Sequence, residues 1–217
     1  MKKSILIFLM ALLPAVTMAA GGGVHLDKAP IDLGDKASLQ RGAKTFVNYC
    51  LSCHSANFMR YNRVGEDLGI SDEEVAANLI FTGAKVGETM EIAMAPKRAE
   101  KWFGITPPDL SVITRARGAD YVYTYLRTFH ADEKRPFGVN NKVLANASMP
   151  HVLWAQQESM SAGEYDRYVG DLVNFMVYMA EPAALKRAAL GPWVLLFIAV
   201  FSFIAYLMKK EYWKDVH

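Results

Sequence analysis

The segment Cys50-Leu51-Ser52-Cys53-His54 constrains this chain more than any other feature. It has the spacing C-x-x-C-H, and it contains the only two cysteines of the chain. Two thiols on one helical turn can each add to one vinyl group of a haem, and the adjacent imidazole can then take an axial position on the iron. The motif therefore predicts one covalently attached haem c, bound through Cys50 and Cys53 with His54 as an iron ligand.

Two other uses of a C-x-x-C pair fit the sequence less well. A thioredoxin-like redox pair needs a βαβ context, and no such pattern surrounds this segment. A structural zinc site needs about four ligands, and the sequence has no second cluster of Cys and His to complete one.

The first 19 residues have the pattern of a secretory signal peptide. Lys2 and Lys3 precede an apolar stretch, residues 5–13, that is too short to span a bilayer. Small residues at Thr17 and Ala19 predict cleavage after Ala19. An uncleaved N-terminal anchor is the alternative. Residues 20–187 are then expected to form one exported domain.

A second apolar segment, residues 188–208, predicts a transmembrane anchor. It has roughly 21 residues without charge, the length that crosses a bilayer. Trp193 and Tyr206 lie near its two ends, where interfacial aromatic residues occur. Lys209 and Lys210 follow directly, so the positive-inside rule places residues 209–217 in the cytoplasm. The expected location is the bacterial inner membrane, crossed once, with the large domain on the periplasmic side and in contact with lipid.

The charge balance argues against a nucleic-acid partner. The whole chain has 24 basic and 22 acidic residues, and its formal net charge is +2. Loss of the signal peptide would remove Lys2 and Lys3 and leave the chain neutral. No basic stripe that could bind phosphates is present.

The exported part is expected to be all-α, with long loops. Apolar residues recur at helical spacing from Leu39 to Tyr49, and Asp35 or Ser38 could cap this helix. Capping boxes at Ser71 and Ser161 each predict the start of a helix, the second running to Pro182. Asp109 is expected to cap another helix, with an interruption at Gly118.

The residue on the face of the iron opposite His54 decides the chemistry, because a second ligand gives a closed centre that only transfers electrons. Met176 and Met179 fit the apolar face of the last soluble helix and are expected in the core. Met94 and Met149 both lie beside a proline in loop-like sequence, and the residues alone rank the two equally. An imidazole is the alternative ligand, from His130 or His151.

Further motifs resemble the cytochrome c1 family, the membrane-anchored haem subunits of cytochrome bc1 complexes. These are Trp102-Phe103-Gly104, Pro107-Pro108-Asp109-Leu110-Ser111, Arg115-Ala116-Arg117 and Asp120-Tyr121-Val122, in this order between the haem motif and the C-terminal anchor. The resemblance covers nearly the whole mature chain. It implies a cytochrome c-like haem domain.

The resemblance also implies roles for particular residues. It makes Met149, in the loop before the last soluble helix, the second axial ligand. It implies that Arg117 and Tyr121 reach a haem propionate, and an Arg fork does suit a buried carboxylate. For one of Arg115 and Arg117, a solvated helix face is the simpler explanation. Pro107 and Pro108 are expected to pack on the haem edge as a rigid wall.

The function implied is that of a one-electron carrier without bond chemistry of its own. Its donor would be the Rieske iron–sulfur protein, in a quinol–cytochrome c oxidoreductase that also contains cytochrome b. Its acceptor would be a soluble or membrane-bound cytochrome c. Two alternatives are another anchored cytochrome that serves an oxidase or a denitrification enzyme, and a haem enzyme or gas sensor with an open iron face.

Overall fold

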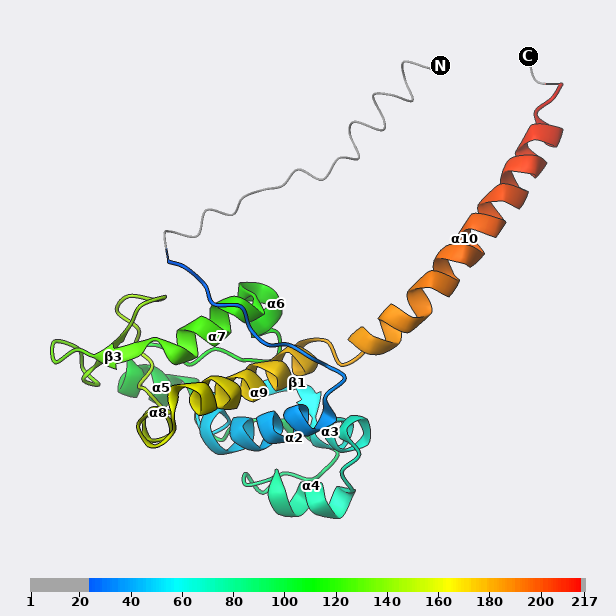
Figure 1. Cartoon of the computed structure of the whole chain (residues 1–217). Coiled ribbons are helices and arrows are strands. Elements are labelled where there is room, and N and C mark those ends of the chain that lie inside the picture. The colour runs from blue at the N-terminus through cyan, green and yellow to red at the C-terminus, as the bar shows by residue number, and fades with distance from the viewer. Residues whose placement is uncertain (1–23, 216–217) are drawn as a thin grey trace.

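The computed structural model describes residues 24–215, so the predicted signal peptide lies outside the described part. The fold is mostly helical, as the sequence predicts, and a long last helix leaves the globular part (Figure 1). The helices are α2 (Lys36–Thr45), the π-helical turn η1 (Phe46–Cys50), α3 (Tyr61–Leu68), α4 (Asp72–Asn78), α5 (Pro96–Phe103), α6 (Ile113–Arg117), α7 (Ala119–Arg127), α8 (Trp154–Ser159), α9 (Ala162–Ala180) and α10 (Ala184–Tyr212).

Helices α2 and α9 pack against each other at the centre of the core. Gly42 makes their close approach possible, because a Cβ atom at this position would lie 2.1 Å from the carbonyl oxygen of Asp171. Phe46 and Phe175 are fully buried on either side of the contact, with ring centroids 5.7 Å apart. Met176 and Met179 are buried on α9, as predicted. The helix that leads into the haem motif is thus fixed against the longest helix of the domain.

Several predicted helix ends are confirmed. The Asp35 side chain accepts a hydrogen bond from the backbone N–H of Ser38, at 3.0 Å. Ser71 and Glu74 form the predicted capping box of α4. The predicted interruption at Gly118 is also present, because this glycine has φ of 92° and separates α6 from α7.

The prediction that Asp109 caps a helix is wrong. Helix α6 begins only at Ile113, and its N-cap residue is Val112. The Asp109 carboxylate instead accepts hydrogen bonds from the backbone N–H groups of Ser111 and Asn57, at 2.8 and 2.9 Å. Asp109 therefore ties the loop before α6 to the segment that follows the haem motif.

Two small antiparallel sheets occur where the sequence pattern indicates no strands. Strand β1 (Ala56–Arg60) pairs with β2 (Thr89–Met90), and β3 (Phe129–Ala131) pairs with β4 (Val139–Asn141). Strands of two to five residues are too short to show an alternating pattern. Strand β1 begins two residues after His54, and β4 ends eight residues before Met149.

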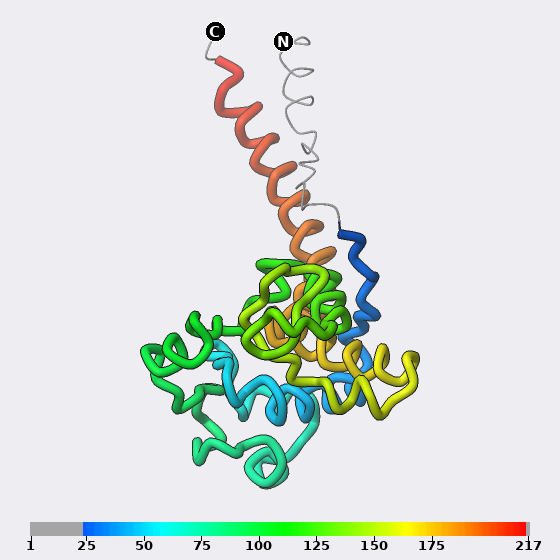
Figure 2. Tube along the Cα trace, turned by 90° about the vertical axis from the view of Figure 1, so that its left-hand side faces the viewer, coloured from blue at the N-terminus to red at the C-terminus, as the bar shows by residue number. Residues whose placement is uncertain are grey.

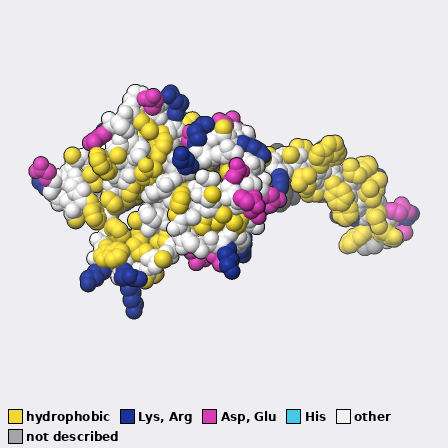
Figure 3. All heavy atoms as spheres, turned by 90° about the horizontal axis from the view of Figure 1, so that it is seen from below, with side chains coloured by type: hydrophobic (Ala, Val, Ile, Leu, Met, Phe, Trp, Pro, Cys, Tyr) yellow, Lys and Arg dark blue, Asp and Glu magenta, His cyan; other side chains and the backbone are white. Residues whose placement is uncertain are grey.

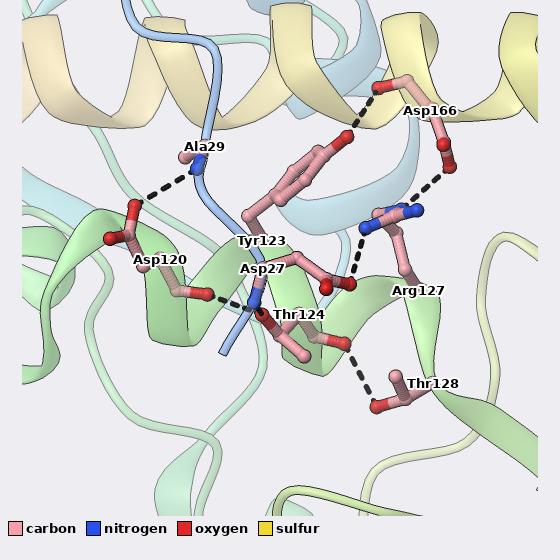
Figure 4. Close-up of polar contacts among 8 residues, drawn as sticks. All are labelled: Asp27, Ala29, Asp120, Tyr123, Thr124, Arg127, Thr128 and Asp166. Carbon is pink, nitrogen blue, oxygen red and sulfur yellow. Dashed lines mark hydrogen bonds and ion pairs between the residues drawn. The ribbon is translucent and has the colours of Figure 1, made fainter. Parts of the chain in front are cut away.

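The N-terminal part of the described chain, residues 24–35, lies across α7 and α9 as a strap (Figure 4). The backbone N–H of Asp27 donates to the Thr124 hydroxyl at 2.8 Å. The Arg127 guanidinium pairs with Asp27 at 2.7 Å and with Asp166 of α9 at 2.6 Å. One arginine therefore joins the strap, α7 and α9.

Helix α10 has 29 residues, none of them buried, and it is long and apolar enough to cross a membrane. It contains the predicted anchor, residues 188–208. Hydrophobic side chains cover most of its length, and charged side chains gather at its far end (Figure 3). Figure 2 shows that α10 rises from one end of the globular part, while the region of α4 lies at the other. Pro192 lies about two turns into the helix, and it removes one backbone donor there.

Candidate haem site

Both cysteines of the motif lie in one tight turn at the end of η1. The backbone N–H groups of Cys53 and His54 both donate to the Cys50 carbonyl, at 3.1 and 2.9 Å. Both thiols are free, with Cys50 buried and Cys53 half-buried. Burial raises the pKa of the Cys50 thiol to about 12. The turn holds two thiols and one imidazole within five residues, as covalent haem attachment requires.

The orientation of His54 is set by a backbone carbonyl. Its Nδ1 lies 2.7 Å from the carbonyl oxygen of Pro108, and that oxygen can only accept a hydrogen bond. The proton therefore sits on Nδ1, and Nε2 keeps its lone pair for a metal. Desolvation also lowers the pKa of His54, which favours the neutral ring that ligates iron. The sequence motif predicts His54 as a ligand, but it does not predict that the Pro108 carbonyl orients its ring.

The segment from Pro108 to Ser111 is joined to residues 54–58 by a hydrogen bond at each of its four residues. The Leu110 N–H donates to the Ser55 carbonyl at 2.9 Å, and the Phe58 N–H donates to the Ser111 hydroxyl at 3.1 Å. Pro107 is half-buried and Pro108 exposed. Together with the two bonds to Asp109, these contacts fix the Pro108 carbonyl, and through it the ring of His54.

The structure brings Arg117 and Tyr121 together. The guanidinium carbon of Arg117 lies 5.7 Å from the centre of the Tyr121 ring. Tyr121 is half-buried and stacks on Tyr125, with centroids 6.3 Å apart and an interplanar angle of 7°. The Arg117 side chain is exposed at the end of α6 and is free to reach an anion over this ring.

Met149 is half-buried and packs against the core from a loop between β4 and α8. The end of this loop is close to the attachment turn. Leu153 is buried with 1% of its surface exposed, and the Gln156 side-chain amide donates to the Tyr49 hydroxyl at 2.6 Å. Tyr49 directly precedes Cys50. A residue far along the sequence is thus connected to the haem motif by a contact that no local pattern predicts.

The other candidate ligands have different surroundings. Met59 and Met90 are buried in the core. Met94 is half-buried and lies two residues after Ile92, whose N–H donates to the Ser55 hydroxyl at 3.1 Å. His130 is exposed on β3. The His151 ring is half-buried, and desolvation lowers its pKa.

The donor set fits a covalently bound haem. Two free thiols and an imidazole with Nε2 available lie in one turn, and a half-buried thioether lies in the loop before α8, which contacts Tyr49. Within residues 24–215, no three His, Cys, Asp or Glu side chains form a group that could hold a metal ion. A helical domain with this attachment turn, followed by one membrane-length helix, defines a membrane-anchored c-type cytochrome.

The comparisons with known proteins narrow this class to one family. The model of the "Cytochrome C1 family" matches residues 27–216. The chain is 45% identical to "Cytochrome c1" of Allochromatium vinosum over 100% of both proteins. It is 52% identical to "Ammonia monooxygenase gamma subunit" of Nitrosomonas europaea, over 98% of this chain and 97% of that protein. The chain belongs to the cytochrome c1 family.

A solved structure titled "Hyperthermophilic respiratory Complex III" covers 100% of this chain, with 96% of its own chain matched. The TM-score is 0.46 and the identity 20%, too low to support an inference. Membership of the family rests on the sequence match. It confirms that the chain carries one covalently bound haem c and that it is an electron-transfer protein with a C-terminal membrane helix.

Proposed function

We propose that this chain passes single electrons from a Rieske iron–sulfur protein to a cytochrome c, as the cytochrome c1 subunit of a quinol–cytochrome c oxidoreductase. One observation carries the proposal. His54 sits in the same turn as two free thiols, and its Nδ1 is held by the Pro108 carbonyl, so that Nε2 is left for an iron. The full-length match to the cytochrome c1 family supports the assignment.

The haem iron supplies reversible change between its ferric and ferrous states. The residues of the chain hold and shield this centre. Cys50 and Cys53 would form the two thioether bonds, and His54 and Met149 would both ligate the iron. With both ligands bound, the centre would transfer electrons and would not bind a substrate. Thioether ligation and an apolar pocket favour the ferrous state, and they raise the reduction potential.

Two contacts support Met149 over Met94 as the second ligand. Met94 lies two residues after Ile92, which donates a hydrogen bond to Ser55, the residue next to His54. This segment therefore lies beside the His54 end of the motif. The segment after Met149 is tied to Tyr49, at the other end of the motif. Replacement by Met149→Leu should keep the covalent haem, lower the midpoint potential and let carbon monoxide bind to the ferrous protein. An unchanged potential would assign the second ligand elsewhere.

Arg117, Tyr121, Pro107 and Pro108 complete the proposed site. The guanidinium of Arg117 is placed over an aromatic ring and can pair with a propionate carboxylate as a charge-assisted donor. The Tyr121 hydroxyl can donate to the same group. Pro107 and Pro108 supply a rigid wall beside His54, because proline fixes its own backbone torsion.

We place the haem domain, residues 20–187, on the periplasmic side of the bacterial inner membrane. Lys209 and Lys210 follow the anchor, residues 188–208, and positive residues favour the cytoplasmic side. The tail, residues 209–217, is then cytoplasmic, and residues 1–19 are a signal peptide. Cytochrome b and the Rieske protein would be the partners within the membrane.

The name of the Nitrosomonas europaea relative suggests a second assignment, to a complex that oxidises ammonia. Co-purification separates the two. The full-length chain, tagged at its C-terminus and extracted in mild detergent, should bring down a multi-helix cytochrome b and a Rieske protein. Quinol should then reduce its haem c in the isolated complex. Recovery with the other subunits of an ammonia monooxygenase instead, and without cytochrome b, would overturn the proposed function.

A further inference from the structure

The side chain of His151 is held on two sides. Its ring lies parallel to that of Phe129, with centroids 4.9 Å apart and an interplanar angle of 5°. Its Nε2 lies 2.7 Å from the Oε1 atom of Gln157. Phe129 belongs to strand β3 and Gln157 to helix α8. A single imidazole therefore joins a strand, a helix and the loop that carries Met149, two residues away.

The partners of His151 are fixed. Phe129 has 6% of its surface exposed, and it receives the edge of the Tyr125 ring at a centroid distance of 5.1 Å. Tyr125 in turn stacks on Tyr121. A continuous row of aromatic rings thus leads from Tyr121 on α7, one of the proposed propionate-binding residues, to His151.

The backbone around Met149 has no comparable support. In the described part of the chain, residues 147–150 make no backbone hydrogen bond and belong to no helix or strand. The position of this stretch depends on side-chain contacts before and after it, and Arg135 and Asn140 bind Asn146 just before it. Asn141 accepts from the N–H groups of Val143 and Leu144 at the start of the loop, and Leu153 is buried at its end. Between Leu144 and Leu153, His151 is the residue held by both a stacked ring and a hydrogen bond.

We propose that His151 is a positioning residue, whose contacts with Phe129 and Gln157 hold the Met149 sulfur at the iron. The inference rests on the proposed ligation by Met149. The stacked pair and the hydrogen bond are each weak, but together they are sufficient to shift an open–closed equilibrium of the loop by about 5- to 30-fold. The same two contacts turn the His151 ring toward β3 and α8, and they occupy Nε2.

The test uses the full-length, haem-loaded protein in detergent. Two readouts report on the loop: the charge-transfer band of methionine bound to ferric haem, and the fraction of ferrous haem that binds carbon monoxide. His151→Ala should weaken the band and raise the carbon monoxide-accessible fraction by about 5- to 30-fold. Gln157→Ala removes only the hydrogen bond, at a helical site that tolerates alanine, and should raise the fraction by a few-fold.

His130→Ala is the matched control. It removes an exposed imidazole from the neighbouring strand and should leave both readouts unchanged. His151→Phe keeps an aromatic ring for Phe129 without the hydrogen bond, and it should resemble Gln157→Ala rather than His151→Ala. If His151→Ala does not accumulate as a haem protein, Gln157→Ala and His151→Phe decide the matter.

The outcomes separate this inference from the proposed function. If Met149→Leu abolishes the band while His151→Ala and Gln157→Ala leave it unchanged, the ligand is correct and the positioning role is wrong. If the wild-type protein lacks the band, or if Met149→Leu has no effect on it, ligation by Met149 fails and the positioning role fails with it. Loss of the band in the His151 variant, with a smaller loss in the Gln157 variant, supports the proposal.

Discussion

The two sides of the haem site are built in different ways. On the side of His54, the His54 ring and backbone groups of residues 55–58 bond directly to the segment from Pro108 to Ser111. On the side of Met149, side chains hold an irregular loop, through His151, Asn141 and Gln156. Attachment of the cofactor depends on the thiols of one turn, residues 50–54. Closure of the iron depends on contacts outside this turn, and these are easier to change without loss of the haem.

The largest expected effect is the loss of covalent haem, and it separates haem attachment from closure of the second face of the iron. In the double variant Cys50→Ala/Cys53→Ala, neither thioether can form, so covalent haem should be lost completely. Haem staining of the denatured chain after gel electrophoresis measures this. Met149→Leu is the control, and it should stain as strongly as the wild type. Staining of the double variant would show that the motif is not the attachment site.

Asn141→Ala should disturb the Met149 side. Asn141 is 2% exposed, its Oδ1 accepts from Val143 and Leu144, and its Nδ2 donates to the Tyr125 carbonyl at 2.7 Å. Loss of these buried bonds should cost about 1–3 kcal/mol of stability. Because the loop begins here, carbon monoxide should also bind to the ferrous variant. A less stable protein that still excludes carbon monoxide would contradict the role given to the loop.

Asp109→Ala provides the matching change on the His54 side. Its carboxylate accepts from Asn57 and Ser111, but the residue is exposed, so the expected loss is smaller, about 1 kcal/mol. The His54 ligand belongs to the covalent turn, and the iron should therefore stay closed to carbon monoxide. Thermal unfolding, monitored by haem absorbance, measures the loss of stability. Carbon monoxide binding to this variant would remove the distinction between the two sides.

The smallest effect concerns alkaline pH. Burial and the neighbouring Tyr121 raise the pKa of Tyr125 to about 12, above the usual value near 10. The folded state then binds the proton more tightly than the unfolded state, so stability is complete below pH ~10 and falls as the pH rises toward 12. Between these values, Tm of the wild type should fall more steeply than Tm of Tyr125→Phe. If Tm falls equally with pH in the two proteins, the raised pKa of Tyr125 is contradicted.

The predictions that succeeded are those that depend on neighbouring residues. The helix cap at Asp35, the capping box at Ser71 and the interruption at Gly118 are all set within one or two turns. The role given to Asp109 was wrong because its carboxylate has a competing partner, the N–H of Asn57, 52 residues earlier. Strands β1 and β2 were missed for the same reason, since they pair with each other across a long stretch of chain. Strands β3 and β4 lie close together in sequence, but each has only three residues and therefore shows no alternating pattern.

In the haem site too, the features set by neighbouring residues were predictable and those set by distant contacts were not. The motif alone predicts Cys50, Cys53 and His54, because their chemistry depends on their spacing. The choice between Met94 and Met149 depends on which loop lies on which side of the attachment turn. The contacts that bear on it, Ile92 with Ser55 and Gln156 with Tyr49, join residues 37 and 107 positions apart. The residues alone therefore left the two methionines equal.

The most direct test is a titration of the reduced, wild-type, full-length protein with carbon monoxide. A haem closed by His54 and Met149 should keep its ferrous spectrum unchanged when carbon monoxide is added. Quinol should still reduce this haem in the assembled complex. A stoichiometric spectral change on addition of carbon monoxide would show an open face and would contradict the account.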